Sequence, residues 1–327
     1  MSQAPLQLFA LNTSRVFGDE VSSALGQALS PHEEREFEDG EHKARPLANV
    51  RGRDVYVLQS LHGDGTQSVN DKLCRLLFFV GALRDAAAGR ITAVLPYLAY
   101  ARKDTRTNPR DPVTLRYVAA MFEAAGTDTV LTLDVHNVSA FQNAFRCRTD
   151  HLDACQLFAG HFAPLVQGTE VVAVSPDSGG VKRANLFRKC LAARLNAQVG
   201  MAYCEKYRRA DTLSGELLVG DVRGKTVIIY DDLISSGQTT ARAARLCRQQ
   251  GASKVYAAAS HALFQPGAAE LLGNAGIDAI VVTDSGGPWR PGQSLPPRLS
   301  VVSCAPLFAQ AIRRMHEDGS VSDLVAW

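Results

Sequence analysis

The sequence predicts an α/β fold with mainly parallel sheets, divided between two domains. Short apolar runs rich in β-branched residues alternate with segments whose apolar residues recur at helical spacing. This alternation is typical of βαβ units, in which helices cover parallel strands. A chain of 327 residues is long enough for two hydrophobic cores. We place the boundary in the segment Thr149–Cys155, which gives domains of 1–155 and 156–327.

The expected strands and helices follow from these runs and from the residues that flank them. The ranges that we expect to be strands are 55–60, 91–98, 129–136, 170–177, 226–232, 254–261, 279–284 and 299–304. Helices are expected over 68–88, where Gly89 follows, from Pro112 to about Gly126, and from about Thr240 to Gln250. The polar segment 203–222 is expected to be a mobile loop or a hairpin.

The most informative stretch runs from 226 to 240. Its buried strand ends in two adjacent acids, and a turn of small hydroxyl residues with one glycine precedes the next helix. Backbone N–H groups at the start of a helix favour a phosphate, whereas carboxylates repel it. Both features suit a ligand that carries a phosphate together with hydroxyls or Mg²⁺, such as a phosphorylated sugar. The alternative is an ordinary strand–turn–helix with an acidic cap. The residues concerned are Asp231, Asp232, Ser235, Ser236, Gly237, Gln238 and Thr239.

Composition narrows the possible partners. A formal charge of +2 gives no general attraction to nucleic acid or to a membrane surface. The seven cysteines include no C-x-x-C pair, which argues against a zinc site or a disulfide framework and favours buried thiols in a reducing compartment. The N-terminus lacks the pattern of a signal peptide, and no apolar run reaches membrane-spanning length. We therefore expect a cytoplasmic protein.

Two other expected strand ends carry polar side chains. Asp134 and His136 follow one strand, where the histidine is either a metal or phosphate contact or a hydrogen-bonded structural residue. Asp177 lies in the sequence SPDSGG after another strand and precedes Lys182 and Arg183. It is either a Mg²⁺ ligand or the cap of a Pro–Asp turn.

Charged segments supply the remaining candidates. The run from Tyr100 to Pro112 contains Arg102 and Lys103 directly after an expected strand, which favours an anion site over a solvated loop. The segment 206–209 is basic and could close over a triphosphate. The stretch FEDGE at 37–41 is expected to be a turn, and its phenylalanine could stack on a base or lie in the core. The sequence contains neither a Walker A motif nor G-x-G-x-x-G.

Several of these segments, in this order, resemble the ribose-phosphate pyrophosphokinases, or phosphoribosyl pyrophosphate (PRPP) synthetases. The resemblance covers nearly the whole chain. It comprises FEDGE at 37–41, LPYLAYARKD at 95–104, LDVH at 133–136, VSPDSGGVKRA at 174–184, DDLISSGQTT at 231–240 and HEDGSVSDL at 316–324. The central motif alone also fits phosphoribosyltransferases. The other motifs favour the synthetase.

The resemblance implies two phosphoribosyltransferase-type domains, with the C-terminal tail expected to pack back on the first. It implies transfer of the β,γ-diphosphoryl group of ATP to the 1-hydroxyl of ribose 5-phosphate, with Mg²⁺, giving PRPP and AMP. ATP would contact Phe37, Asp39, Glu41, Arg102, Lys103 and Asp104. Ribose 5-phosphate would contact Asp231, Asp232 and residues 235–239. Lys206, Arg208 and His136 would be catalytic, and His136 and Asp177 would be associated with the metal. The family also implies a homo-oligomer built from dimers, up to a hexamer, in which a neighbouring subunit donates the FEDGE turn.

The chain departs from the family pattern in its phosphate loops. Lys103 replaces the usual Gln, Thr105 replaces a basic residue, Ser235 replaces an Asp frequent in bacterial members, and Gln238 replaces a Gly. Two alternatives therefore remain beside the synthetase. One is a phosphoribosyltransferase that consumes PRPP, and the other is a non-catalytic regulatory subunit of synthetase-like fold.

Overall fold

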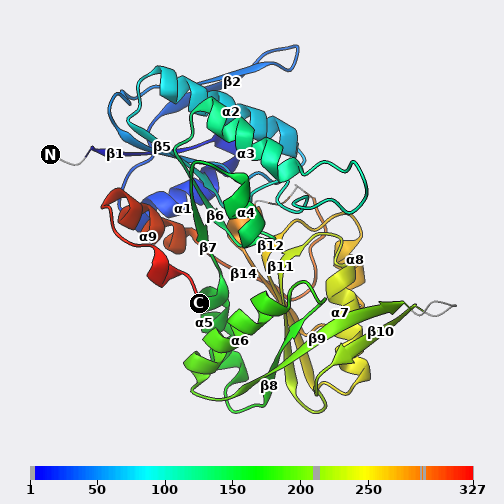
Figure 1. Ribbon diagram of the computed structural model, residues 1–327. Helices are drawn as coiled ribbons and strands as arrows, with labels where there is room; N and C mark the ends of the chain where they lie inside the picture. Colours follow the sequence, from blue (N-terminus) through cyan, green and yellow to red (C-terminus); the bar gives the residue numbers. More distant parts are fainter. Residues whose placement is uncertain (1–3, 209–213, 288, 290–291, 327) are drawn as a thin grey trace. The chain divides into compact units, whose positions relative to one another are not determined.

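The computed structural model describes residues 4–208, 214–287, 289 and 292–326. The chain forms two compact units (Figure 1). Unit 1 comprises residues 1–152, 285–290 and 304–325, and unit 2 comprises residues 153–284, 291–303 and 326–327. Each unit has its own sheet and its own helices.

The sheet of unit 1 is parallel throughout its five strands, in the order β1-β4-β5-β6-β7. Every residue of the central strands β4 and β6 is buried, as expected for strands covered on both faces. The strands are β1 (Leu6–Ala10), β4 (Asp54–Leu58), β5 (Arg90–Leu95), β6 (Thr129–Leu133) and β7 (Arg148–Leu152).

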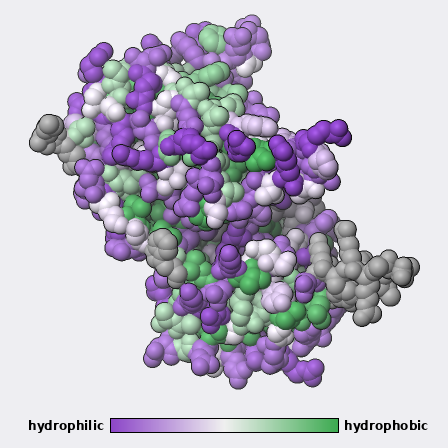
Figure 2. Space-filling view, viewed as in Figure 1, coloured by the Kyte–Doolittle hydropathy of each residue, from purple (hydrophilic) through white to green (hydrophobic). Residues whose placement is uncertain are grey.

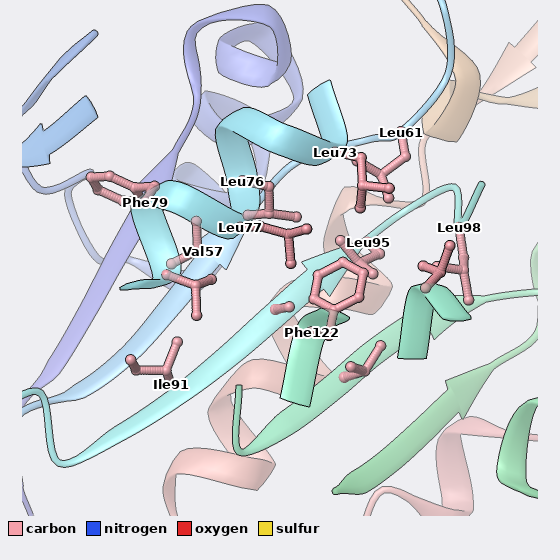
Figure 3. Packing of buried hydrophobic residues seen from close by; sticks show 14 of the residues in the cluster. Val57, Leu61, Leu73, Leu76, Leu77, Phe79, Ile91, Leu95, Leu98 and Phe122 are labelled. Atoms are coloured by element: carbon pink, nitrogen blue, oxygen red, sulfur yellow. The ribbon is translucent and has the colours of Figure 1, made fainter. Parts of the chain in front are cut away.

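Helices cover both faces of this sheet (Figure 1). On one face, α2 and α3 place Leu76, Leu77 and Phe122 against Val57 and Ile91 of the strands (Figure 3). On the other face, α1 packs against α9. The helices are α1 (Arg15–Leu25), α2 (Val69–Asp85), α3 (Thr114–Ala125), α4 (Val138–Ala144) and α9 (Ala305–His316). The short 3₁₀ helices are η1 (Asn12–Ser14), η2 (Asp284–Gly286, where the chain passes from unit 2 to unit 1) and η3 (Ser322–Leu324).

An antiparallel hairpin, β2 (His32–Glu36) and β3 (His42–Pro46), forms a separate two-stranded sheet in unit 1. The residues between its strands are 37–41, so the FEDGE segment is the hairpin turn, as predicted. Phe37 N–H donates to the Glu41 carbonyl at 2.7 Å and closes this turn.

The sheet of unit 2 has seven strands in the order β10-β9-β8-β11-β12-β13-β14. All neighbours are parallel except β9 and β10, which form an antiparallel hairpin. Its strands are β8 (Val171–Ser175), β9 (Val199–Arg208), β10 (Ser214–Val219), β11 (Thr226–Ile234), β12 (Lys254–Ala262), β13 (Ala279–Thr283) and β14 (Leu299–Val302). Its helices are α5 (Cys155–Val166), α6 (Val181–Leu195), α7 (Gln238–Gln249) and α8 (Ala268–Gly273).

The structure confirms the predicted α/β class with mainly parallel sheets, and it corrects several elements. The segment Thr149–Cys155, in which we place the domain boundary, is mostly regular structure, since residues 148–152 form the edge strand β7 and α5 begins at Cys155. Strand β11 continues to Ile234, so the two acids lie within the strand and do not end it. Helix α7 begins at Gln238, two residues earlier than predicted. Residues 203–222 include the β9–β10 hairpin, one of the two predicted alternatives.

The face in Figure 2 is largely hydrophilic, with hydrophobic residues in small separate patches. Across the described part of the chain, no helix has the length and apolar character needed to cross a membrane.

Candidate active site

The acid pair Asp231 and Asp232 lies near the carboxyl end of β11, which is flanked by the parallel strands β8 and β12. The two side chains are only 14% and 8% exposed. Burial raises the pKa of Asp231 well above its ordinary value, and the neighbouring Asp232 raises it further. Two carboxylates so close together require a compensating positive charge.

Arg183, in the first turn of α6, supplies that charge. Its Nη1 atom lies 3.0 Å from Oδ1 of Asp232 and 3.5 Å from Oδ1 of Asp231. The arginine lowers the pKa of Asp231 and so opposes the effects of burial and of Asp232. In the sequence, Arg183 follows the SPDSGG motif closely, and nothing there indicates a contact with the acids. Its contact with the acid pair depends on β8 lying beside β11.

The residues after the acid pair form a tight loop into α7. Gly237 has φ +78°, a left-handed conformation that glycine adopts without strain. A Cβ atom on Gly237 would lie 2.9 Å from Cγ of Leu272 in α8. A backbone hydrogen bond also stabilises the loop: Gln265 N–H donates to the Ser235 carbonyl at 2.9 Å. Ser236 and Gln238 are exposed at the start of the helix, where N–H groups favour an anion.

Asp177 follows β8 and organises the turn into α6. Its Oδ1 atom accepts a hydrogen bond from Gly180 N–H at 2.9 Å, and its carbonyl accepts one from Ser175 Oγ at 2.6 Å. The side chain is nevertheless exposed. Asp177 therefore makes the turn contact expected of a helix cap, and one carboxylate oxygen takes no part in that contact.

In unit 1, His136 lies just beyond β6 and is exposed. Asp134 beside it is 4% exposed and has φ +38°, an uncommon conformation for a residue other than glycine. Asp134 N–H donates to the Leu152 carbonyl of β7 at 2.9 Å. Asn137 caps α4 by accepting from Ala140 N–H at 3.1 Å. The chain thus turns sharply out of the sheet at this histidine.

The basic segment after β5 is an organised loop. Lys103 Nζ lies 2.7 Å from Oδ2 of Asp111, and the same oxygen accepts hydrogen bonds from Thr107 and Asn108. Hydrogen bonds from Lys103 and Thr107 hold the pKa of Asp111 below its ordinary value. Arg102 is exposed and Asp104 is half-buried in this loop.

At the hairpin turn of unit 1, Phe37 is 39% exposed. The Arg35 guanidinium carbon lies 5.1 Å from the centre of its ring, a cation–π arrangement. Asp39 Oδ1 accepts from Glu41 N–H at 3.1 Å, and both acidic residues are exposed. The ring therefore lies on the surface, not in the core.

Lys206 and Arg208 lie in β9, in register with Glu216 and Ser214 of β10. The side chains of these residues, and Arg209 entirely, lie outside the described part of the structure.

The described residues contain no group of three or more His, Cys, Asp or Glu side chains arranged to hold a metal. Magnesium is usually bound by one or two carboxylates together with water and substrate phosphates, and not by an all-protein cage. The exposed carboxylate of Asp177 suits that mode. An imidazole nitrogen is a poor direct ligand for Mg²⁺, so His136 suits a contact with metal-bound water or phosphate.

Comparison with known proteins agrees with the sequence resemblance. Residues 6–126 match the family model for the N-terminal domain of ribose phosphate pyrophosphokinase, and residues 210–326 match the model for the phosphoribosyl synthetase-associated domain. A Streptococcus pneumoniae protein named "Putative ribose-phosphate pyrophosphokinase 2" is 38% identical over 324 residues, covering 98% of this chain and 97% of its own length. An Enterococcus faecalis relative, "Putative ribose-phosphate pyrophosphokinase 1", is 36% identical over 320 residues, covering 98% of this chain and 95% of its own length.

A solved structure shows the same architecture. The crystal structure of phosphoribosylpyrophosphate synthetase from Mycobacterium smegmatis superposes with a TM-score of 0.86 at 35% sequence identity. The match covers 96% of this chain and all of that one. The two units therefore have the synthetase fold.

Proposed function

Because the chain belongs to the ribose-phosphate pyrophosphokinase family of enzymes, we propose that it transfers the β,γ-diphosphoryl group of ATP to the 1-hydroxyl of ribose 5-phosphate. The products are PRPP and AMP, which places the enzyme in nucleotide biosynthesis. The observation that carries this proposal is the buried acid pair of β11, followed directly by the glycine loop of α7. Within a few residues, this arrangement offers carboxylates that can accept hydrogen bonds from sugar hydroxyls and a helix start that can bind a phosphate.

In this proposal Asp231 and Asp232 accept hydrogen bonds from the ribose hydroxyls. Residues Ser235, Ser236, Gly237, Gln238 and Thr239 surround the 5-phosphate at the start of α7. The start of α7 supports this assignment, because the backbone N–H groups there favour an anion. Ser235 and Gln238, which depart from the family pattern, add two polar side chains to the same loop.

The ATP side uses residues of unit 1. Arg102, Lys103 and Asp104 form the phosphate-facing loop, and the Phe37 ring stacks on adenine while Asp39 and Glu41 accept from its polar edge. The exposure of Phe37 at the hairpin turn supports a role outside the core. In a homo-oligomer built from dimers, up to a hexamer, this turn serves the nucleotide of a neighbouring subunit.

Bound Mg²⁺ would neutralise the phosphate charge and orient the diphosphoryl group. Asp177 would supply a carboxylate oxygen to the ion, and His136 would contact metal-bound water or the phosphates. Lys206 and Arg208 lie on the β9–β10 hairpin and provide positive charge to the group in transfer. Phosphoryl-type transfer depends mainly on positioning and charge neutralisation, so this set needs no covalent intermediate.

The decisive experiment incubates the purified protein with ATP, ribose 5-phosphate and Mg²⁺ and quantifies AMP and PRPP. We expect equal amounts of the two products, with no product when either substrate is left out. If PRPP is instead consumed when a nucleobase is supplied, the protein is a phosphoribosyltransferase. If it neither forms nor consumes PRPP, it is a non-catalytic regulatory subunit, and the proposal is wrong.

A further inference from the structure

Arg183 is a cationic neighbour of the acid pair, and the family resemblance has not assigned it a role. Arg183 lies on α6, which follows β8, whereas Asp231 and Asp232 lie on β11. These strands are adjacent and parallel, so their carboxyl ends meet at one edge of the sheet. A single guanidinium nitrogen, Nη1, reaches one carboxylate oxygen of each acid. The arginine side chain is 17% exposed, so this contact is largely screened from water.

The environment makes the charge of Arg183 significant. Burial and the Asp232 carboxylate both raise the pKa of Asp231, whereas the guanidinium and a hydrogen bond from Asp232 N–H lower it. Two other charged or titratable groups lie on elements that pack against β11: Arg242 of α7, which donates to the Pro176 carbonyl, and the buried His261 of β12. Asp177 lies beyond β8 and is bound to its own turn.

We propose that Arg183 is a positioning residue for ribose 5-phosphate, which fixes the orientation of the Asp231–Asp232 pair through one guanidinium nitrogen that reaches both carboxyl groups. This inference rests on the proposed function, because it assigns the acid pair to the ribose hydroxyls. Two ionised carboxylates accept hydrogen bonds from two hydroxyls, whereas a protonated carboxyl would donate to its partner and lose an acceptor.

The sign of the pH effect follows directly. Without Arg183, Asp231 binds a proton at a higher pH than in the wild type, so the ribose site loses an acceptor in a pH range where the wild type still has it. Raising the pH removes that proton and restores both acceptors. The loss of affinity in a variant without the charge must therefore be large at low pH and small at high pH.

The test compares Arg183→Gln with the wild type at saturating Mg²⁺ and ATP, measuring kcat and KM for ribose 5-phosphate from pH 6.5 to 9. We expect the ratio of variant KM to wild-type KM to be roughly tenfold or more at pH 6.5 and to fall below about threefold at pH 9. The ratio is used because the phosphate of the substrate itself titrates near pH 6. Arg183→Lys, which retains a charge, should recover most of the affinity at pH 6.5.

Lys182→Gln is the matched control, since it removes the same charge from the neighbouring, exposed position. It should follow the wild type at every pH. A KM ratio for Arg183→Gln that is independent of pH, or a change in kcat alone, overturns the inference, as does an Arg183→Lys variant no better than Arg183→Gln. Thermal melting verifies folding, and Arg183→Met replaces the Gln variant if the latter does not fold. A wild-type protein that forms no AMP would instead refute the proposed function itself.

Discussion

Gly237 has two separate reasons to be glycine. Its φ of +78° disfavours any residue with a Cβ atom, and that atom would also lie 2.9 Å from Leu272 Cγ. Gly224 is the matched control, because it has φ +73° but no neighbour within 4 Å. We expect Gly224→Ala to cost about 1 kcal/mol of stability from backbone strain. Gly237→Ala should cost at least about 2 kcal/mol, because the crowded Leu272 must also move.

Thermal or denaturant unfolding of both glycine variants measures this difference. Gly237→Ala should in addition raise the KM for ribose 5-phosphate, since the loop that we propose to hold its phosphate moves with the helix start. Equal losses of stability in the two variants would mean that the contact with Leu272 is relieved at no cost.

Lys206 is proposed to act on the group in transfer and not on the bound sugar. We expect Lys206→Ala to lower kcat by about 100-fold or more and to change the KM for ribose 5-phosphate only slightly. Lys189→Ala, which removes an exposed lysine from α6, is the control and should behave as the wild type. Near-normal turnover in Lys206→Ala would remove this lysine from the mechanism.

At the level of an element, the loop between β5 and α3 depends on Asp111. One oxygen of this carboxylate contacts Lys103, Thr107 and Asn108. We expect Asp111→Asn to raise the KM for ATP by roughly threefold to tenfold, because the loop that carries Arg102 is no longer closed. Asp19→Asn changes the same charge in the exposed pair with Arg15 and should leave the KM unchanged. An unaltered KM in Asp111→Asn would show that loop order does not affect ATP binding.

The start of α2 contains a buried ion pair with a defined pH dependence. Lys72 is fully buried, and its Nζ lies 2.8 Å from Oδ2 of Asp64. Burial raises the pKa of Asp64, but hydrogen bonds from Lys72, Thr66 and Gln67 outweigh it, so the net pKa is below its ordinary value. A carboxyl of this kind contributes stability that is present above the unfolded-state pKa of about 3.9 and lost as the pH falls through the folded-state value.

Asp64→Asn should therefore destabilise the protein by about 1–3 kcal/mol at pH 5–7, and the difference from the wild type should shrink below about pH 4. Unfolding measured across this pH range checks the prediction. Asp85→Asn, at the exposed end of α2, serves as control. A difference that grows as the pH falls would contradict the assigned direction of the Asp64 pKa.

Elements that are buried on both faces were predictable from the sequence, and edge elements were not. Strands β6 and β11 appear as continuous apolar runs because helices cover both of their faces. Strand β7, with the sequence RTDHL, and strand β2, with HEERE, are largely polar because each lies at a sheet edge or in an exposed hairpin. Their pairing with a neighbour, and not their composition, makes them strands.

The candidate site was predictable only where a motif is continuous in sequence. The acids and the glycine loop lie within 231–239 and were identified together. The contact of Arg183 with the acids was missed because β8 and β11, although adjacent in the sheet, are separated by β9 and β10 in the chain. The acids and the glycine loop remain predictions as site residues, as do Arg102, His136 and Lys206.

At the scale of the whole molecule, α9 is bound by side chains from strands that come more than 200 residues earlier in the chain. Arg90 donates to both oxygens of the buried Asp54 and to the Met315 carbonyl, and His316 Nδ1 lies 2.8 Å from the same carboxylate. Removing Arg90 leaves Asp54, 5% exposed, without its main partner. We expect Arg90→Ala to cost about 1–3 kcal/mol, after allowance for the partly exposed arginine.

The control for this prediction is Arg15→Ala, which breaks an ion pair whose two side chains are both more than half exposed. It should cost no more than about 0.5 kcal/mol. Denaturant unfolding of the two variants provides the comparison. Equal costs would mean that the Asp54 cluster contributes little to the attachment of α9.

The attachment of α9 also affects how the chain folds during its synthesis. Phe17 of α1 packs against Phe308 of α9, and Arg313 donates to the Leu25 carbonyl at the end of α1. The ribosome completes residues 1–152 first, but the helix that covers α1 follows about 150 residues later. At about 5–20 residues per second, these roughly 150 residues take about 8–30 s to synthesise, so the apolar side of α1 waits at least that long for its partner. A nascent chain halted before Cys304 lacks α9 and would therefore expose Phe17. We expect such a chain to bind chaperones, and a chain that has completed α9 to bind them no longer.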